Sequence, residues 1–247
     1  MEAGARKFSV NMERITIWTG PDHACSYLSG REARFGYVSP DQALSPQSYR
    51  GLLELGFRRS GNWVYRPCCR GCEACIPVRL PVKDFHLTRS QRRVLKLNTD
   101  MEIHASDARF DERQFRLYSR YLAVRHPTDT QVSRDDYWSF LGSSWAETRF
   151  VEFRSQGNLL GVAVADYVPR AMSAVYTFFD PDAAARSPGS LAILWQILEA
   201  RRLGFDWLYL GYWIGGCRKM EYKAKFRPLE AMLGGRWRRF EVDEPLP

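Results

Sequence analysis

Four of the six cysteines lie within eight positions, at Cys68, Cys69, Cys72 and Cys75, and arginines flank the group. The last three repeat at a three-residue interval, which brings thiolates close enough to share a soft metal ion or cluster. Neighbouring cationic side chains favour the ionised thiol that metals bind. With Cys25 or Cys68 as the fourth ligand, the segment predicts a zinc or iron-sulfur site. Because the sequence has no second separated pair and no histidine at finger spacing, reduced structural or redox-sensitive thiols are the alternative.

Composition divides the chain into two parts. Residues 1–100 are rich in glycine and proline, which predicts a small cysteine-containing N-terminal domain of short strands and turns. Residues 101–247 show helical and strand periodicity in turn. An antiparallel meander, a helix and one more strand follow one another there, in the order of an acetyltransferase-like (GNAT) α/β domain. The predicted fold class is therefore α+β.

Local signals place several elements. Ser45, Pro46 and Gly56 suit a helix cap, a first helical position and a helix stop, so a short helix is expected over 45–56. A hairpin that turns at residues 60–62 is expected over 57–67. Apolar residues at helical spacing predict a helix over 111–125, which Pro127 ends. We also expect a basic helix or arm from residue 90, a helix over 187–204, and strands over 149–154, 159–167, 172–179 and 205–213.

The charge distribution indicates an anionic partner. The net charge is +8; residues 50–100 hold 11 basic and 4 acidic side chains, and residues 201–240 hold 10 and 3. Two basic regions favour nucleic acid, and a generally basic, solvated surface is the alternative. No apolar run approaches the roughly 20 residues that cross a bilayer, and the first residues have no signal-peptide pattern. We therefore expect a cytoplasmic protein with reduced cysteines and no membrane association.

Six separate blocks of the sequence resemble the arginyl-tRNA protein transferase family. They lie at residues 25–28, 65–77, 90–93, 118–126, 173–181 and 209–223, and the last reads Tyr-Leu-Gly-Tyr-Trp-Ile-Gly-Gly-Cys-Arg-Lys-Met-Glu-Tyr-Lys. The short chain, with a single Cys25 in place of a closely spaced pair, is more similar to the bacterial aspartate/glutamate leucyltransferase branch. The resemblance implies transfer of leucine from leucyl-tRNA to proteins that begin with Asp or Glu, in the N-end rule degradation pathway.

Three alternative functions compete with leucyl transfer. Arginine transfer from arginyl-tRNA to the same acceptors remains open, because no residue pattern identifies the amino acid on the tRNA. A coenzyme A dependent N-acetyltransferase fits the order of elements, but Leu191 stands where such enzymes have a small residue. A metal-stabilised RNA-binding module without catalysis fits the cysteines and the charge.

The transfer reaction needs no covalent enzyme intermediate, because a deprotonated α-amine is itself a competent nucleophile. No cofactor is then required for catalysis besides the aminoacyl-tRNA co-substrate, and the enzyme must position the reactants, remove a proton and stabilise an oxyanion. Asp166, at the end of an apolar strand, is the first candidate for handling the proton or for binding the incoming ammonium group. Tyr176 and Tyr212 are candidates for orienting the ester or for acting as weak acids. The alternatives are a carboxylate that caps a turn or binds Arg170, and core tyrosines with satisfied hydroxyls.

Cationic side chains are needed for two binding tasks. Recognition of an acidic first residue requires Arg or Lys near its carboxylate, and the family blocks indicate Arg218, Lys219, Lys223, Arg125 and His126. Phosphate contacts to tRNA are expected from Arg89, Arg92, Arg93 and Lys96. A helix N-terminus attracts phosphate, which makes the helix start a further candidate, at Arg186, Gly189 and Ser190. A solvated basic face, or simply a well-capped helix, is the alternative in each case.

Overall fold

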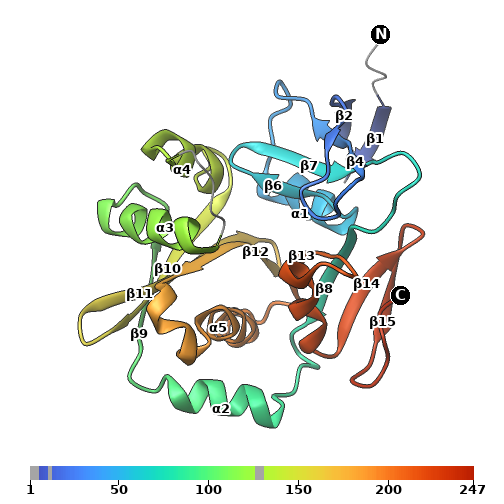
Figure 1. Cartoon of the computed structure of the whole chain (residues 1–247). Helices are drawn as coiled ribbons and strands as arrows, with labels where there is room; N and C mark the ends of the chain where they lie inside the picture. Colours follow the sequence, from blue (N-terminus) through green and yellow to red (C-terminus); the bar gives the residue numbers. More distant parts are fainter. Residues whose placement is uncertain (1–5, 11–12, 126–130) are drawn as a thin grey trace.

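Two β-sheets form the frame of the structure, a computed structural model that describes residues 6–10, 13–125 and 131–247 (Figure 1). The small sheet runs in the order β1 (Arg6–Val10), β2 (Glu13–Thr19), β5 (Phe35–Val38), β7 (Trp63–Pro67) and β6 (Arg58–Ser60). The large sheet runs in the order β15 (Arg236–Phe240), β14 (Leu229–Leu233), β8 (Ile76–Pro81), β13 (Trp207–Trp213), β12 (Ala171–Phe179), β11 (Asn158–Val168), β10 (Glu147–Ser155) and β9 (Glu102–Asp107). A short ribbon pairs β3 (His23–Ala24) with β4 (Glu32–Ala33). The expected mixture of helices and strands is confirmed, and the structure builds it around one large sheet.

Helix α1 (Pro46–Glu54) lies between the two sheets. The Oγ atom of Ser45 accepts a hydrogen bond from the backbone N–H of Ser48 at 3.1 Å, and Pro46 occupies the first helical turn. Gly56 follows the helix with a φ of +80°, a conformation that glycine adopts without strain. The cap, the proline and the glycine therefore act as the sequence predicts.

The core around α1 joins the sheets. Leu52 and Leu53 are 1% exposed and belong to a cluster with Ile17 of the small sheet and with Val168 and Ala171 of the large sheet. Burial of such side chains stabilises each by about 1.5–3 kcal/mol relative to exposure. The relative position of the two sheets is therefore fixed by apolar packing on both sides of one short helix.

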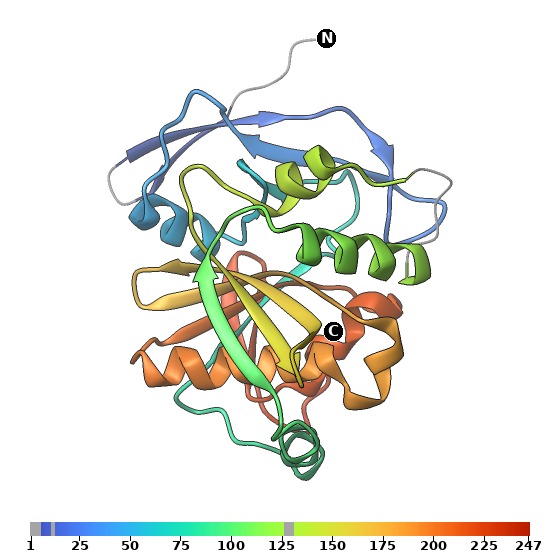
Figure 2. The same ribbon diagram turned by 90° about the vertical axis from the view of Figure 1, so that its left-hand side faces the viewer.

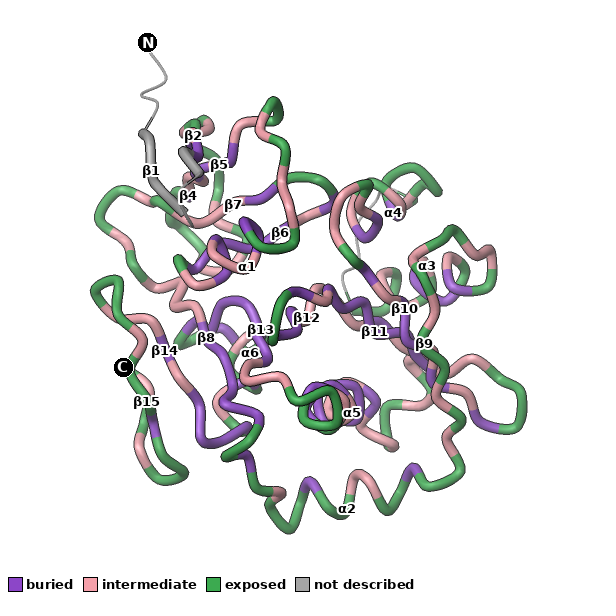
Figure 3. The backbone as a smooth tube through the Cα atoms, turned by 180° about the vertical axis from the view of Figure 1, so that it is seen from behind, coloured by how far each residue is buried: buried purple, intermediate pink, exposed green. Residues whose placement is uncertain are grey.

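Helices cover both faces of the large sheet (Figure 2). Helix α5 (Pro188–Arg202) packs against Val151 and Phe153, whereas α3 (Glu112–Arg125) and α4 (Arg134–Leu141) pack against Phe150. The alternation of these strand residues separates the two faces. Helix α2 (Arg89–Leu97) lies on the outer side of α5 and is largely exposed, in contrast to the buried central strands (Figure 3). Within the described residues, no helix has both the length and the apolar character required to span a membrane.

Strand β8 connects the amino-terminal part of the chain to the large sheet. It comes from the first 100 residues, directly after the cysteine segment, and pairs with β13 on one side and β14 on the other. The small sheet, which precedes it, includes the hairpin β6–β7 that the sequence predicts. The division at residue 100 stays a prediction, and the two parts of the chain share the large sheet.

Candidate active site

The parallel strands β12 and β13 separate after a short paired stretch. Ala171–Ser173 pair with Trp207–Tyr209, and both strands then continue without pairing to each other, to Phe179 and Trp213. Ligands of open α/β sheets bind outside the carboxyl ends of parallel strands where the strands diverge. We call the region between residues 174–179 and 210–213 the strand junction, and it is the candidate active site.

Arg58 of β6 lies at the strand junction. Its Nη1 donates to Oγ of Ser173 at 2.9 Å, and its Nη2 donates to the carbonyl oxygen of Ala174. Gly211, with a φ of +83°, permits this approach, because a Cβ atom there would lie 3.3 Å from Nε of Arg58. The guanidinium is buried, and the described residues place no carboxylate in an ion pair with it. The junction therefore holds a positive charge suited to an anionic ligand or an oxyanion.

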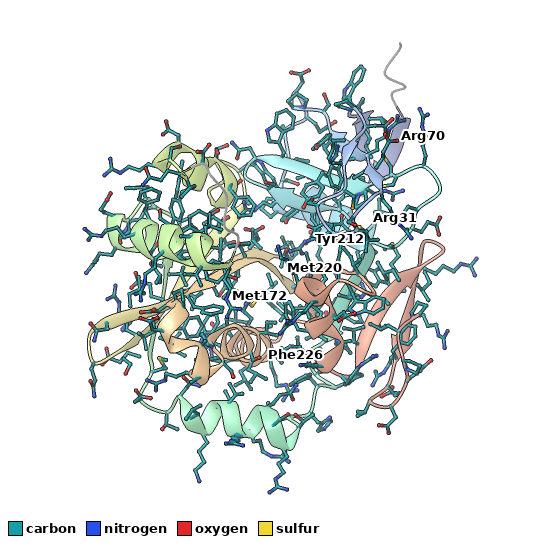
Figure 4. The ribbon with its side chains drawn as sticks, viewed as in Figure 1. Arg31, Arg70, Met172, Tyr212, Met220 and Phe226 are labelled. Carbon is teal, nitrogen blue, oxygen red and sulfur yellow. The ribbon has the colours of Figure 1, made fainter. Side chains whose placement is uncertain are left out.

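Lys223 lies at the same junction. After β13 the chain turns through α6 (Arg218–Glu221) into the 3-10 turn η2 (Tyr222–Lys225), and Nζ of Lys223 donates to the carbonyl oxygen of Tyr212. Sδ of Met220 lies 3.3 Å from the same nitrogen, and Figure 4 shows Tyr212 and Met220 close together at the centre of the molecule. Burial, assisted by the charge of Arg58, lowers the pKa of Lys223 to about 7. Lys223 is thus buried, and its expected role in binding the acceptor carboxylate stays a prediction.

Asp166 is fully buried between the two sheets, and its carboxylate is saturated with hydrogen bonds. Arg59 of β6 donates to it from Nε and Nη2, both at 2.6 Å, and the hydroxyls of Tyr49 and Thr148 donate at 3.0 and 2.8 Å. This arrangement favours a link between the sheets over the proton handling that the sequence predicts. Arg170, the partner suggested by sequence, instead binds a different carboxylate.

The two candidate tyrosines have different environments. Tyr176 of β12 packs edge-on against Tyr118 and Phe140, with ring centroids 6.1 and 5.1 Å apart, and burial raises its pKa. Tyr212 donates its hydroxyl hydrogen to the carbonyl oxygen of Gly56 at 2.9 Å. The structure therefore gives Tyr212 the core role that was the alternative, and Tyr176 stays a candidate for orienting the ester.

The start of α5 provides backbone N–H groups next to the strand junction. Ser187 has a φ of +54° and makes no side-chain cap, so the N–H groups of Gly189 and Ser190 are not capped by its hydroxyl. A Cβ atom on Gly189 would lie 3.6 Å from the ring of Phe179, and the guanidinium of Arg125 lies 5.5 Å from the centroid of that ring. A helix N-terminus and an arginine thus meet at the end of β12, a combination that favours phosphate.

Arg186 is held in place by contacts with the end of α2. Its side chain forms an ion pair with Asp100 and donates to Oδ1 of Asn98 at 3.2 Å. Its carbonyl oxygen accepts from Nδ2 of Asn98 at 2.9 Å. These contacts support a role in joining α2 to the start of α5, rather than the expected phosphate contact.

Three further cations predicted to bind the acceptor, Arg125, Arg218 and Lys219, lie on the surface. Arg218 and Lys219 are exposed on α6, at the turn that carries Lys223 to the junction. Glu221 of the same helix accepts from the backbone N–H of Gly216 at 2.9 Å, which fixes this turn. His126 lies outside the described residues. The structure therefore groups Arg218 and Lys219 on one short element and places Arg125 elsewhere, at the end of α3.

Helix α2 presents its basic residues to solvent. Thr88 caps it by accepting from the N–H of Gln91 at 3.2 Å, and Arg89, Arg92, Arg93 and Lys96 are all exposed. Arg89 and Arg93 line an open hollow of about 560 Å³. The predicted basic helix is confirmed, and its role in tRNA binding stays a prediction.

Five of the six cysteines lie in two loops beside the small sheet, and Cys217 lies at the start of α6. Arg31, which Figure 4 labels at this edge with Arg70, donates from Nη1 to Sγ of Cys72 at 3.4 Å. A backbone hydrogen bond from Ala74, together with Arg31, lowers the pKa of Cys72, whereas burial raises the pKa of Cys75 to about 12. Ala74 and Arg31 therefore favour the thiolate form of Cys72, whereas burial favours the thiol form of Cys75.

The thiols as placed do not form the expected metal site. Sγ of Cys25 accepts from the backbone N–H of Leu28, and Sγ of Cys69 accepts from that of Arg34, both at 3.4 Å. In the part of the chain that the structure describes, no three His, Cys, Asp or Glu side chains come together in a group able to hold a metal ion. The geometry therefore favours the alternative of reduced structural or redox-sensitive thiols.

Sequence reasoning missed Arg58. The signal was two adjacent arginines, Arg58 and Arg59, in a short strand that the hairpin pattern places next to apolar residues. Neighbouring strand residues point to opposite faces, so at most one of them can reach a given partner. Both side chains are less than 10% exposed, which is unusual for arginine and marks them for specific contacts.

The fold is a mixed sheet in which helix α5 connects two diverging parallel strands. It is similar to the C-terminal domain (DUF2156) of a putative lysylphosphatidylglycerol synthetase from Agrobacterium fabrum, with a TM-score of 0.50 and 12% identity, covering 85% of this chain and 71% of that one. Residues 23–93 match the family described as "Arginine-tRNA-protein transferase, N terminus", and residues 113–233 match its "C terminus" counterpart.

Two relatives extend the match over nearly the whole chain. The aspartate/glutamate leucyltransferase of Alkalilimnicola ehrlichii is 47% identical, covering 92% of this chain and 96% of the relative. The protein of the same description from Pseudomonas fluorescens (strain Pf-5) is 45% identical, covering 92% and 97%. The chain therefore belongs to the arginine-tRNA-protein transferase family, and the resemblance to its bacterial branch is confirmed.

Proposed function

We propose that this protein transfers leucine from leucyl-tRNA to the α-amine of proteins that begin with Asp or Glu, and so creates a degradation signal. The observation that carries the proposal is the 45–47% identity, over more than nine-tenths of each chain, to proteins described as aspartate/glutamate leucyltransferases. The reaction is an acyl transfer on an acetyltransferase-like (GNAT) scaffold, with the aminoacyl-tRNA as co-substrate.

The strand junction suits a tRNA-borne ester. Arg58 supplies a buried guanidinium next to the diverging strands, where a developing oxyanion is stabilised more strongly than in water. The N-terminus of α5 and Arg125 flank Phe179 and suit the phosphates near the ester. Tyr176 of β12, within the junction, is our candidate for orienting the reactants. Exposed Arg89, Arg92, Arg93 and Lys96 on α2 extend the positive surface for the rest of the tRNA.

Recognition of the acceptor requires a cation beside the junction. Arg218 and Lys219 stand on the four-residue helix α6, directly after the turn that closes β13. An arginine binds a carboxylate through two parallel hydrogen bonds, which gives specificity for Asp and Glu over neutral first residues. We assign the acceptor carboxylate to these two side chains.

Incubation of the purified protein with radiolabelled leucyl-tRNA or arginyl-tRNA, and with peptides that begin with Asp, Glu or Ala, tests the proposal. We expect label from leucyl-tRNA to enter only the Asp and Glu peptides. Label from arginyl-tRNA in the same peptides would identify arginine as the donor. Acetyl transfer from coenzyme A, or tRNA binding without product from either charged tRNA, would refute aminoacyl transfer.

A further inference from the structure

Lys223 is the one buried lysine among the described residues, with 6% of its surface exposed. Two other buried cations have carboxylate partners: Arg59 pairs with Asp166, and Arg79 pairs with Glu230. Lys223 instead donates to a neutral carbonyl oxygen and lies beside a thioether sulfur. A buried ammonium without a counter-ion is costly, and the usual outcome is loss of its proton.

The groups that surround the amine of Lys223 determine its protonation state. Nζ of Lys223 lies 5.9 Å from the centroid of the Tyr222 ring. Arg58, from β6, disfavours the ammonium, whereas Cys217 and Cys75 favour it weakly. Burial is the largest influence, and the pKa of Lys223 falls to about 7 from an ordinary value near 10.5. At neutral pH a large fraction of the molecules therefore carries a neutral amine at this site.

The position of this amine is tied to the strand junction by β13. Tyr212, whose carbonyl oxygen accepts from Nζ, comes three residues after Tyr209, the last residue that pairs with β12. Arg58 spans the other side of the junction, from Ser173 to the backbone of Gly211. The neutral amine and the permanent cation thus occupy one end of the two diverging strands.

We propose that Lys223 is a catalytic residue, the proton acceptor for the α-ammonium group of the acceptor protein. The proposal rests on the proposed function and deepens it. An acceptor amine, with an ordinary pKa near 8, is mostly protonated at neutral pH and cannot attack in that form. A base whose pKa lies near the working pH combines availability with driving force for proton transfer.

The step balances without any further reactant. Neutral Lys223 takes one proton from the α-ammonium group, and the freed nitrogen lone pair forms a bond to the carbonyl carbon of the leucyl ester. The nitrogen then loses a second proton as the carbon–oxygen bond to the ribose breaks, and the ribose oxygen receives that proton. The third hydrogen remains on the new amide, and Lys223 releases its proton to solvent.

Two substitutions separate proton acceptance from charge. Lys223→Met removes the base and keeps an apolar side chain of similar length, whereas Lys223→Arg keeps a cation that does not lose its proton near neutral pH. We expect both to lower kcat on the order of 10²- to 10⁴-fold and to leave KM for tRNA and peptide within a few-fold. The matched control is Lys225→Met, which removes the exposed lysine of the same turn and should retain the wild-type kcat.

The pH profile and chemical rescue complete the test. In the wild type, kcat for an Asp-initiated peptide should rise through an inflection near pH 7 that both variants lack. Small primary amines such as ethylamine should restore activity to Lys223→Ala, more so as their basicity increases. Circular dichroism confirms folding of each variant.

The outcomes distinguish the inference from the function it rests on. An inactive wild type would overturn both. An active wild type with Lys223→Arg near full kcat would show that charge is what matters, and would overturn the inference alone. If the Lys223 variants raise KM for the peptide and leave kcat unchanged, Lys223 binds the acceptor carboxylate, and the inference that it accepts a proton is overturned.

Discussion

Replacement of Asp166 by asparagine tests whether this carboxylate links the sheets or handles a proton. Asp166 is 0% exposed, and Arg59, equally buried, donates two hydrogen bonds to it. Asparagine keeps the shape and can still accept from Tyr49 or Thr148, but it removes the counter-charge of Arg59. Loss of one partner of a buried pair costs about 3–5 kcal/mol, because the remaining charge stays buried without compensation. That is a large share of the roughly 5–15 kcal/mol that stabilises a domain.

Urea unfolding, followed by tryptophan fluorescence, measures the loss for Asp166→Asn. We expect a lower midpoint with an unchanged denaturant slope, because the surface exposed on unfolding stays the same. The matched control is Asp206→Asn, where the carboxylate pairs with exposed Arg170 and Lys83. Surface pairs of this kind contribute about 0–1 kcal/mol. The two variants make the same chemical change and differ in burial.

Activity decides between the two roles. We expect the folded fraction of Asp166→Asn, assayed at low temperature, to retain kcat within about tenfold of the wild type. A general base contributes about 10²- to 10⁴-fold. A loss of that size in a variant destabilised by less than about 1 kcal/mol would refute the structural role and restore Asp166 as the proton acceptor.

Three further predictions concern binding and stability. Arg218→Ala should raise KM for Asp- and Glu-initiated peptides by about 10-fold or more, because a charged hydrogen bond contributes about 1.5–3 kcal/mol; unchanged peptide kinetics would remove Arg218 from the site. Replacing Arg92 and Arg93 by Gln should lower the salt slope of tRNA binding by about 2, and an unchanged slope would assign both to solvent. Because folding lowers the pKa of Lys223, the unfolded chain binds more protons than the folded chain between pH 7 and pH 10. The free energy of unfolding of the wild type should therefore rise with pH over this range, relative to Lys223→Met, by up to about 1.4 kcal/mol per pH unit. The same pH dependence in both proteins, measured by thermal or urea unfolding, would contradict this.

Elements with local signals could be predicted from the sequence. Ser45, Pro46 and Gly56 act within a few residues of one another, and the helix they predict is present as α1. The same holds for α2, α3, α5 and the strands from β10 to β13. Because a cap or a turn depends on neighbouring residues alone, it can be predicted from a single sequence.

The site depended on contacts between distant residues. For Asp166 the sequence indicated a role in handling the proton, with a turn or Arg170 as the alternative, whereas its partner in the structure, Arg59, lies 107 residues earlier in the chain. The cysteine spacing likewise gave no sign of two features that come from elsewhere in the fold: Arg31 from another loop contacts Cys72, and burial raises the pKa of Cys75. Contacts between residues far apart in the chain arise because the two sheets stack on each other. No local sequence pattern predicts that stacking.

The adjacent arginines of β6 explain how one site can hold both a fixed charge and a titratable base. Arg59 turns to Asp166 and is neutralised there, so Arg58, on the opposite face, is the charge that reaches the strand junction. Guanidinium keeps its proton under all physiological conditions, whereas a buried ammonium gives its proton up. The field of Arg58 therefore adds to burial in lowering the pKa of Lys223. Arginine at both position 58 and position 223 would bind anions but accept no proton. Lysine at both positions would leave the oxyanion without a permanent cation. The proposed acyl transfer therefore requires one arginine and one lysine.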